Sequence, residues 1–324
     1  MANRYEAKAI RPKTGIVKND HKVKMSDGTS LQVIRKGSIK GERNRVRDAE
    51  IKDAKRRILN RIPLQERKIR GTMLRAIDDF ELIVLKLERL GGRDRQGNLK
   101  VVEKSKLLRT CNKFSKNKVK ELKNRVELEI ESSVKTYMIG IRRSLPNRDL
   151  LSMDKIKEIA KRKAKEIMKT KIAGASTNQR INRYGLKIRD GLMNHAELNK
   201  MGRIANLKKL KKNFVDPKNS HRSCIARGVA RITRTEQNRA MHEAVLEFMQ
   251  ANNFEFVYWR LSNAHKSYGG NEVCEVLATN TGEGVEKSLL QSNNNLNRSG
   301  LYLADAFPLI PHANCMCSIE PIFI

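Results

Sequence analysis

Apolar residues recur at three- and four-residue steps through much of the chain, which is the spacing of one face of an α-helix. Over residues 46–90 this repeat predicts a helix with the core candidates Met73, Ile77, Phe80, Val84, Leu87 and Leu90. Gly91 and Gly92 then supply a C-terminal stop, because glycine readily adopts the conformation that ends a helix. Pro63 stands where a helix could begin, since its missing N–H costs nothing in the first turn.

The same spacing predicts further helices along the chain. One covers about 102–145 and ends at Pro146, with the core candidates Leu122, Val126, Ile130, Val134, Tyr137 and Ile141. Ser152 can cap the next helix, whose core positions are Ile156, Ile159, Ala160 and Ile167. More helix is expected over 178–201 and 203–212. A long helix over about 221–252 has the apolar stripe Ile225, Val229, Ile232, Ala240, Ala244 and Phe248.

Glu236 falls on this last apolar stripe, four residues after Ile232 and four before Ala240. A carboxylate on a buried face needs a cationic or hydrogen-bonding partner. We expect that partner to be a nearby arginine or a basic residue from elsewhere in the fold; the nearby candidates are Arg231, Arg234 and Arg239.

Short runs rich in β-branched and aromatic residues predict a few strands. Residues 254–261 (FEFVYWRL) and the apolar end 318–324 have this composition, and 23–34 contains an Asp-Gly turn signal of a hairpin. We therefore expect a mainly α protein: an elongated basic helical body followed by a small α+β C-terminal domain. The expected division is a basic arm (1–45), the helical body (46–220) and the C-terminal domain (221–324).

Charge is distributed unevenly along the sequence. The chain has a formal net charge of +33; residues 1–240 contain 64 Lys and Arg against 26 Asp and Glu, whereas residues 241–324 contain 4 against 9. Such an excess repels itself unless a polyanion is near, and nucleic acid is the partner that this predicts. The alternative is a highly soluble protein whose lysines only face water. The basic residues are spread along the chain, which favours binding of nucleic acid without recognition of its base sequence.

Several classes of function are not expected. No run of about 18 apolar residues predicts a membrane span, and the basic N-terminus lacks the apolar run of a signal peptide, so we expect synthesis in the cytoplasm. Phosphate-loop, zinc-protease, serine-hydrolase and paired-carboxylate nuclease patterns are absent from the sequence. We therefore expect a protein that is not an enzyme.

Cysteine and histidine gather near the C-terminus. Thiolates and imidazole suit tetrahedral zinc, and a Cys₃His ligand set is offered by Cys274, His312, Cys315 and Cys317. Zinc would stabilise a domain with a modest core. Two alternatives remain open: small buried thiols beside a histidine that pads the fold, or a disulfide in an assembled, oxidised particle. Cys111 and Cys224, isolated in helices, are expected in the core.

Three local patterns in one order resemble the C-terminal domain of the phage Mu F-like minor head proteins. The first is Arg234-Thr235-Glu236 within a helix; the second is Trp259 in a strand, followed by His265 and Cys274; the last is Pro311-His312-Ala313-Asn314-Cys315-Met316-Cys317. The resemblance covers about 221–322. The family commonly has a second cysteine at the first turn, where this chain has Leu277, and an arginine at the position of Met316.

The resemblance implies a structural component of the virion interior that acts in head morphogenesis and DNA packaging near the portal. Its implied partners are the phage portal and major capsid proteins and packaged double-stranded DNA, bound without sequence preference, and no membrane. The cysteines and histidine would stabilise the fold, with Thr235, Glu236 and Trp259 in the core. Two alternatives remain: a nucleic-acid-binding protein that acts outside any virion, and a metal-dependent nuclease or a transferase that uses Glu236.

Overall fold

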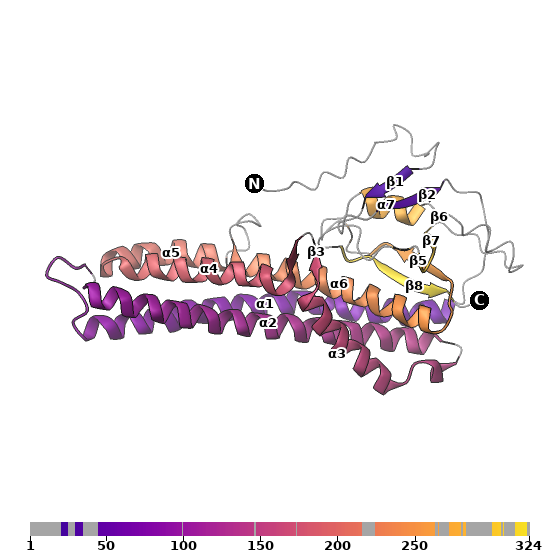
Figure 1. Cartoon of the computed structure of the whole chain (residues 1–324), viewed down its shortest axis with the longest axis horizontal. Coiled ribbons are helices and arrows are strands. Elements are labelled where there is room, and N and C mark those ends of the chain that lie inside the picture. Colours follow the sequence, from indigo (N-terminus) through magenta and orange to yellow (C-terminus); the bar gives the residue numbers. More distant parts are fainter. Residues whose placement is uncertain are drawn as a thin grey trace, which may run out of the picture. The chain divides into compact units, whose positions relative to one another are not determined.

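The computed structural model describes residues 21–24, 30–34, 45–98, 100–145, 147–172, 174–215, 224–262, 265, 272–279, 281–282, 300–305, 307 and 315–322. The fold is mainly helical, with a small three-stranded sheet built largely from the C-terminal part of the chain (Figure 1). The predicted fold class is therefore confirmed. Within the described residues, no helix is both long enough and apolar enough to cross a membrane.

The helices follow the predicted apolar repeats closely. They are α1 (Arg45–Arg89), α2 (Val101–Ser144), α3 (Met153–Lys169), α4 (Thr177–Glu197), α5 (Lys200–Val215), α6 (Ile225–Ala251) and the short α7 (Glu272–Thr279), with a 3₁₀ turn at Arg148–Leu150. The strands are β1 (His21–Lys24), β2 (Ser30–Ile34), β3 (Lys171–Ile172), β4 (Ala175–Ser176), β5 (Phe256–Arg260), β6 (Thr281–Gly282), β7 (Leu301–Leu303) and β8 (Ser318–Ile322).

Local capping signals explain several helix ends. Ser152 caps α3 as predicted, because its side chain accepts a hydrogen bond from the backbone N–H of Lys155. Ser176 and Gln179 form a reciprocal capping box at the start of α4. Helix α1 ends at Arg89, and Gly91 follows with a φ of 71°. That left-handed conformation favours glycine, which confirms the predicted stop.

Two predictions about α1 are wrong. Pro63 lies inside the helix and does not begin one. The apolar face continues through Ile62 and Ile69, both at most 1% exposed, so burial on either side of Pro63 outweighs the loss of one backbone hydrogen bond. Leu90 is 69% exposed because it lies beyond the helix end. The remaining predicted core residues are buried, except Ile232 and Thr235, which are half-buried.

The chain forms two compact units, each assembled from separate stretches of sequence. Unit 1 consists of Met1–Asn60, Ile130–Gly174 and Arg234–Ile324, and unit 2 consists of Arg61–Glu129 and Ala175–Thr233. Helices α1, α2 and α6 contribute residues to both. The division into an arm, a body and a C-terminal domain stays a prediction, since these units are defined by contacts and not by independent folding.

Unit 2 is built from helices packed through apolar faces. Gly185 of α4 permits a close approach to α2, because a Cβ added there would lie 2.6 Å from Cγ2 of Val119. Its carbonyl accepts a 2.6 Å hydrogen bond from the hydroxyl of Ser115. A buried guanidinium adds a polar anchor: Arg203 of α5 donates to both carboxylate oxygens of Glu88 at 2.5 and 2.7 Å. Helix packing and this ion pair therefore hold unit 2 together.

Unit 1 contains two small sheets as well as helices. In one sheet β5 is the central strand, antiparallel to β7 and to β8, and Trp259 of β5 pairs with Ile319 of β8. The hydroxyl of Tyr137, on α2, donates a 2.7 Å hydrogen bond to the carbonyl of Ile319 and so attaches β8 to the helices. The other sheet has the order β1-β2-β6, and its antiparallel β1–β2 pair confirms the hairpin predicted over 23–34.

Candidate metal centre

Three elements of unit 1 bring cysteine and histidine side chains together at one end of β5 and β8. Cys315 and Cys317 immediately precede β8, Cys274 lies in α7, and His265 lies in the turn after β5. All four side chains are buried. The indole N–H of Trp259, itself fully buried, donates to the carbonyl of Cys274 at 3.2 Å and fixes α7 to the sheet.

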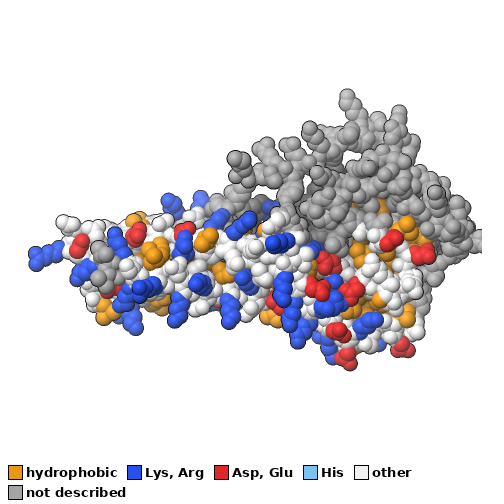
Figure 2. All heavy atoms as spheres, in the orientation of Figure 1, with side chains coloured by type: hydrophobic (Ala, Val, Ile, Leu, Met, Phe, Trp, Pro, Cys, Tyr) orange, Lys and Arg blue, Asp and Glu red, His pale blue; other side chains and the backbone are white. Residues whose placement is uncertain are grey.

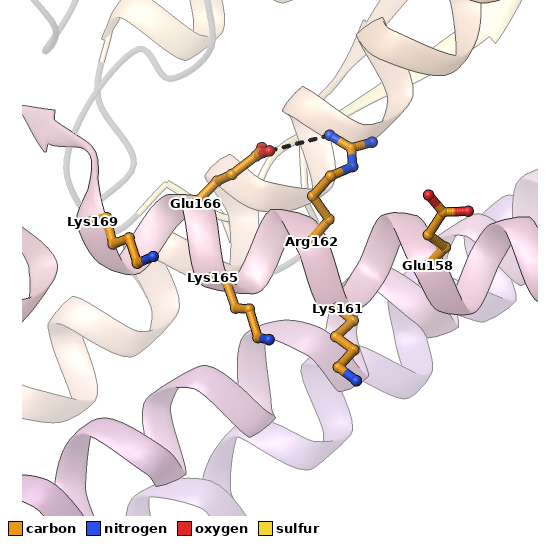
Figure 3. Close-up of a pocket in the computed structure, with 6 residues that line it drawn as sticks. All are labelled: Glu158, Lys161, Arg162, Lys165, Glu166 and Lys169. Carbon is orange, nitrogen blue, oxygen red and sulfur yellow. Dashed lines mark hydrogen bonds and ion pairs between the residues drawn. The ribbon is translucent and has the colours of Figure 1, made fainter.

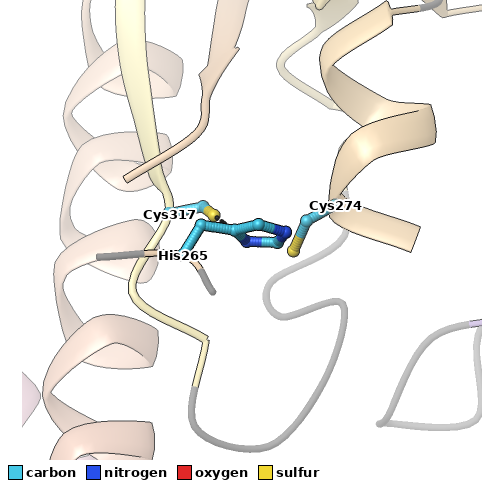
Figure 4. Close-up of side chains that lie close together, drawn as sticks. All are labelled: His265, Cys274 and Cys317. Atoms are coloured by element: carbon cyan, nitrogen blue, oxygen red, sulfur yellow. Dashed lines mark hydrogen bonds between the residues drawn. The ribbon is translucent and has the colours of Figure 1, made fainter. Parts of the chain in front are cut away.

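Two distances within this cluster are close to those of a tetrahedral metal site. Figure 4 shows the imidazole of His265 lying between the sulfurs of Cys274 and Cys317. The ligand atoms of these three residues all lie within 4.8 Å of one another, so the cluster could hold a metal ion. The sulfur of Cys317 is 3.5 Å from Nδ1 of His265, and the sulfurs of Cys274 and Cys315 are 3.6 Å apart. Tetrahedral zinc places two thiolate sulfurs about 3.8 Å apart, and a sulfur and an imidazole nitrogen about 3.6 Å apart.

The backbone of Cys317 is held by three buried polar side chains. Its carbonyl accepts hydrogen bonds from Nδ2 of Asn238 at 2.9 Å and from Nζ of Lys55 at 3.5 Å, and it lies 3.1 Å from Nε2 of His242. Lys55 also donates to Oδ1 of Asn238 at 2.8 Å. Helices α1 and α6 therefore fix the position of one candidate ligand before any ion binds.

The ionisation of the cluster is asymmetric. Hydrogen bonds from the thiols of Cys274 and Cys315 lower the pKa of the Cys317 thiol, and the backbone of Ser262 and the imidazole of His265 lower it further. Desolvation raises the pKa of both Cys274 and Cys315. One thiolate is thus favoured at Cys317, and ionisation of the other two requires a nearby positive charge, which a metal ion supplies.

The two ring nitrogens of His265 have different surroundings. Its Nδ1 lies 3.5 Å from the sulfur of Cys317, while its buried Nε2 has no hydrogen-bond partner among the described residues. The nearest carboxylate oxygen recorded for Nε2 is Oε1 of Glu275, at 3.8 Å. The residues present therefore fit a metal ion with thiolate and imidazole ligands.

The structure brings together three of the four residues predicted to bind metal. Cys274, Cys315 and Cys317 converge, and Cys274 lies in a helix where the resemblance implied a turn. His312 lies outside the described residues, so its role stays a prediction. The sulfurs of Cys274 and Cys315 are too far apart for a disulfide, and all five cysteines are free. Cys111 and Cys224 are buried in unit 2, as expected.

Sequence reasoning missed His265 as a candidate ligand and missed the polar residues behind Cys317. The position of His265, six residues after Trp259 and nine before Cys274, was visible but matched no metal-binding spacing. Asn238 and His242 stand four apart in a helix, so they share one face, and polar residues on a buried face indicate a specific partner. Lys55 lies 183 residues from Asn238, and no sequence signal could join them.

Glu236 has a cationic partner, as the sequence predicted. Its side chain is 1% exposed, and Oε2 lies 3.4 Å from Nη1 of Arg239. Arg239 also donates from Nε to Glu243 at 2.9 Å. The arginine was among the three predicted candidates, so this prediction is confirmed.

Comparison with known protein families, with curated proteins and with solved structures finds no match to this chain.

Proposed function

We propose that this chain is a non-enzymatic minor head protein of a phage, acting in head morphogenesis and DNA packaging, with unit 2 lying beside packaged DNA. The charge of unit 2 carries the proposal: residues 61–129 and 175–233 contain 33 Lys and Arg against 13 Asp and Glu. Blue lysine and arginine side chains are spread over the visible surface of α1, α2, α4 and α5 with few carboxylates between them (Figure 2). A polyanion is the partner that such a surface favours.

The resemblance of about 221–322 to the Mu F-like minor head proteins supports packaged phage DNA as the proposed polyanion. Within a phage head the DNA is extremely concentrated, so weak binding without sequence preference is sufficient. The portal and major capsid proteins are the proposed protein partners, and the interior of the virion is the proposed location.

We propose zinc as the metal of the cluster, with Cys274, Cys315, Cys317 and His265 as ligands. Three soft thiolates and one imidazole form the donor set of a closed structural zinc site, which leaves no position open for substrate. When bound, the ion would supply the positive charge that ionises the thiols. The chain's own residues would orient the ligands: Trp259 holds Cys274, and Asn238 holds Cys317.

The role proposed for Glu236 is structural. Its burial and its ion pair with Arg239 satisfy the carboxylate within the fold. DNA cleavage by the purified chain that is abolished by Glu236→Gln would contradict this role and favour the nuclease alternative.

Quantitative mass spectrometry of proheads and DNA-filled particles, from the phage that encodes this chain, tests the proposed function. We expect the chain at low stoichiometry relative to the major capsid protein. Absence from both kinds of particle would contradict a head protein and favour a nucleic-acid-binding protein outside the virion.

The metal proposal has its own test. Elemental analysis of the full chain, purified under reducing conditions, should find one zinc ion per chain. Treatment with a chelator should release it and lower the melting temperature. Protein that carries no metal and does not bind added zinc would instead support buried thiols that only fill space.

A further inference from the structure

A shallow groove in unit 2 lies between α2 and α4 and has a cationic lining. Its volume is about 430 Å³, and it is lined by Lys116, Lys120 and Lys123 from α2 and by Arg189 from α4. Ser115, Val119 and Gly185 are also part of the lining. Among the described residues, no carboxylate lines the groove.

The lysines of this groove are available to an external anion. Among the described residues, no carboxylate forms an ion pair with Lys116, Lys120 or Lys123, and the first two are exposed. Lys118 of the same helix differs, since it pairs with Asp79 and with Glu121. The groove lysines lie at positions i, i+4 and i+7 and therefore share one helix face. Arg189 is partly neutralised by Asp190, at 2.7 Å.

A second cationic hollow, on α3 in unit 1, has carboxylates in its own lining that neutralise part of its charge. It has a volume of about 310 Å³, and its lining includes the carboxylates Glu158 and Glu166 beside its cations. Figure 3 shows Arg162 directed toward Glu166, with which it is ion-paired at 3.3 Å. Arg162 also pairs with Glu247. The groove between α2 and α4 has no comparable carboxylates in its lining, so its positive charge remains largely uncompensated.

The dimensions and chemistry of the groove fit a phosphate backbone. From Lys116 to Lys123 the helix rises about 10 Å, which spans about three phosphates of one strand of a duplex. The described residues of the lining include no aromatic side chain, so they offer no platform on which unpaired bases could stack. We propose that the groove between α2 and α4 is the site at which this chain binds the phosphate backbone of double-stranded DNA. This inference rests on the proposed position of unit 2 beside packaged DNA.

Binding of the full-length protein to a short DNA duplex of arbitrary sequence, measured across a salt series, tests the groove. The test variant combines Lys116→Gln, Lys120→Gln and Lys123→Gln. The control variant combines Lys208→Gln, Lys209→Gln and Lys212→Gln, which removes the same charge from exposed positions on α5 of the same unit. Circular dichroism melts establish that each variant is folded.

We expect the groove variant to bind about 100-fold more weakly near 150 mM salt, because each lost phosphate contact removes about 0.9 from the slope of log K against log salt. The slope should therefore fall by roughly 2.7, while the control variant changes it much less. Equal losses in the two variants would overturn the groove but leave the proposed role of unit 2 intact. An unaltered chain that binds no duplex even at low salt would overturn both.

A double variant with only Lys116→Gln and Lys120→Gln alters exposed side chains and leaves the half-buried Lys123 in place. In this variant the slope of log K against log salt should fall by about 1.8. If the triple variant does not fold, an unchanged slope in the folded double variant would overturn the proposal. Comparison of the duplex with a single strand of the same length decides the partner: tighter binding of the single strand would contradict a duplex site.

Discussion

The two compact units place their polar and charged groups in different ways. Unit 1 buries polar groups around its C-terminal strands: Lys55, Asn238 and His242 surround the carbonyl of Cys317, and Glu320 of β8 is ion-paired with Arg260 of β5. Unit 2 buries mainly apolar helix faces and keeps most of its cations at the surface. We infer that a few buried polar contacts and a metal stabilise unit 1, whereas helix packing stabilises unit 2 and leaves its surface charge for a partner.

Removal of the metal should have the largest effect, and it should act on unit 1. Cys317→Ala is expected to lose the ion and with it a stabilisation on the order of 10 kcal/mol, the scale for structural zinc. Cys111→Ala is the matched control, since this buried thiol belongs to unit 2 and is not part of the cluster. It should keep the metal and cost about 1 kcal/mol. Elemental analysis and denaturant unfolding measure both, and full metal content in Cys317→Ala would contradict the ligand assignment.

Loss of the polar support behind Cys317 should have the next largest effect. Asn238→Ala removes the donor to the carbonyl of Cys317 and an acceptor of the buried Lys55 ammonium. We expect a loss of about 3 kcal/mol in the free energy of unfolding, since a buried charge is left less well paired. Metal affinity should also fall.

The control for this variant is Asn252→Ala, just beyond α6, where the side chain donates, within the described part of the chain, only to the carbonyl of Phe248. It should cost about 1 kcal/mol at most, with metal affinity unchanged. Equal effects of the two substitutions on metal affinity would show that Asn238 does not position the ligand.

A substitution that crowds the contact between α2 and α4 tests the helix packing of unit 2. Gly185→Ala would place a Cβ 2.6 Å from the stiff side chain of Val119, and it should destabilise by about 2 kcal/mol through overpacking. Gly71→Ala, on α1 of the same unit, has its nearest neighbour at 3.7 Å. That substitution should stabilise by about 0.5–1 kcal/mol, because alanine favours helix. Thermal melts measure both effects, and the metal content should be unchanged in both variants. Destabilisation by both variants would contradict the open space at Gly71.

The smallest predicted effect is the loss of an ion pair in unit 2, and it depends on pH. Hydrogen bonds from Arg203, with a further contribution from Arg93, lower the pKa of Glu88 from its ordinary 4.5. The folded state therefore holds the ionised form more strongly than the unfolded state. This stabilisation is fully present above pH 4.5 and is lost as the pH falls through the lowered pKa.

Glu88→Gln should therefore cost about 1.5 kcal/mol at pH 7, and the difference from the unaltered chain should shrink in acid. Urea unfolding at several pH values measures it. Glu197→Gln, an exposed carboxylate of α4, is the control with the same charge change and should have little effect at any pH. A difference for Glu88→Gln that stays constant down to the most acidic conditions would show that the ion pair is not its source.

Much of the helical framework was predictable from local pattern. The repeats that predicted helices over 46–90 and 102–145 correspond to α1 and α2, and Ser152 caps α3, because amphipathic spacing and capping act over a few residues. The position of Pro63 was misjudged for the opposite reason. A local rule placed a helix start there, whereas the burial of Ile62 and Ile69 along one continuous face kept the helix intact.

By itself, the sequence determined the helical class, the concentration of positive charge before residue 241 and the presence of thiol ligands near the C-terminus. Only the tertiary structure decided which groups meet. His265, which no metal-binding spacing had marked, comes to the sulfurs of Cys274 and Cys317, and Lys55 reaches Cys317 across 262 positions of sequence. The physical reason is that helix periodicity and charge are local properties, whereas a metal site or a cationic groove is created by the packing of segments whose order in the chain does not specify their distance.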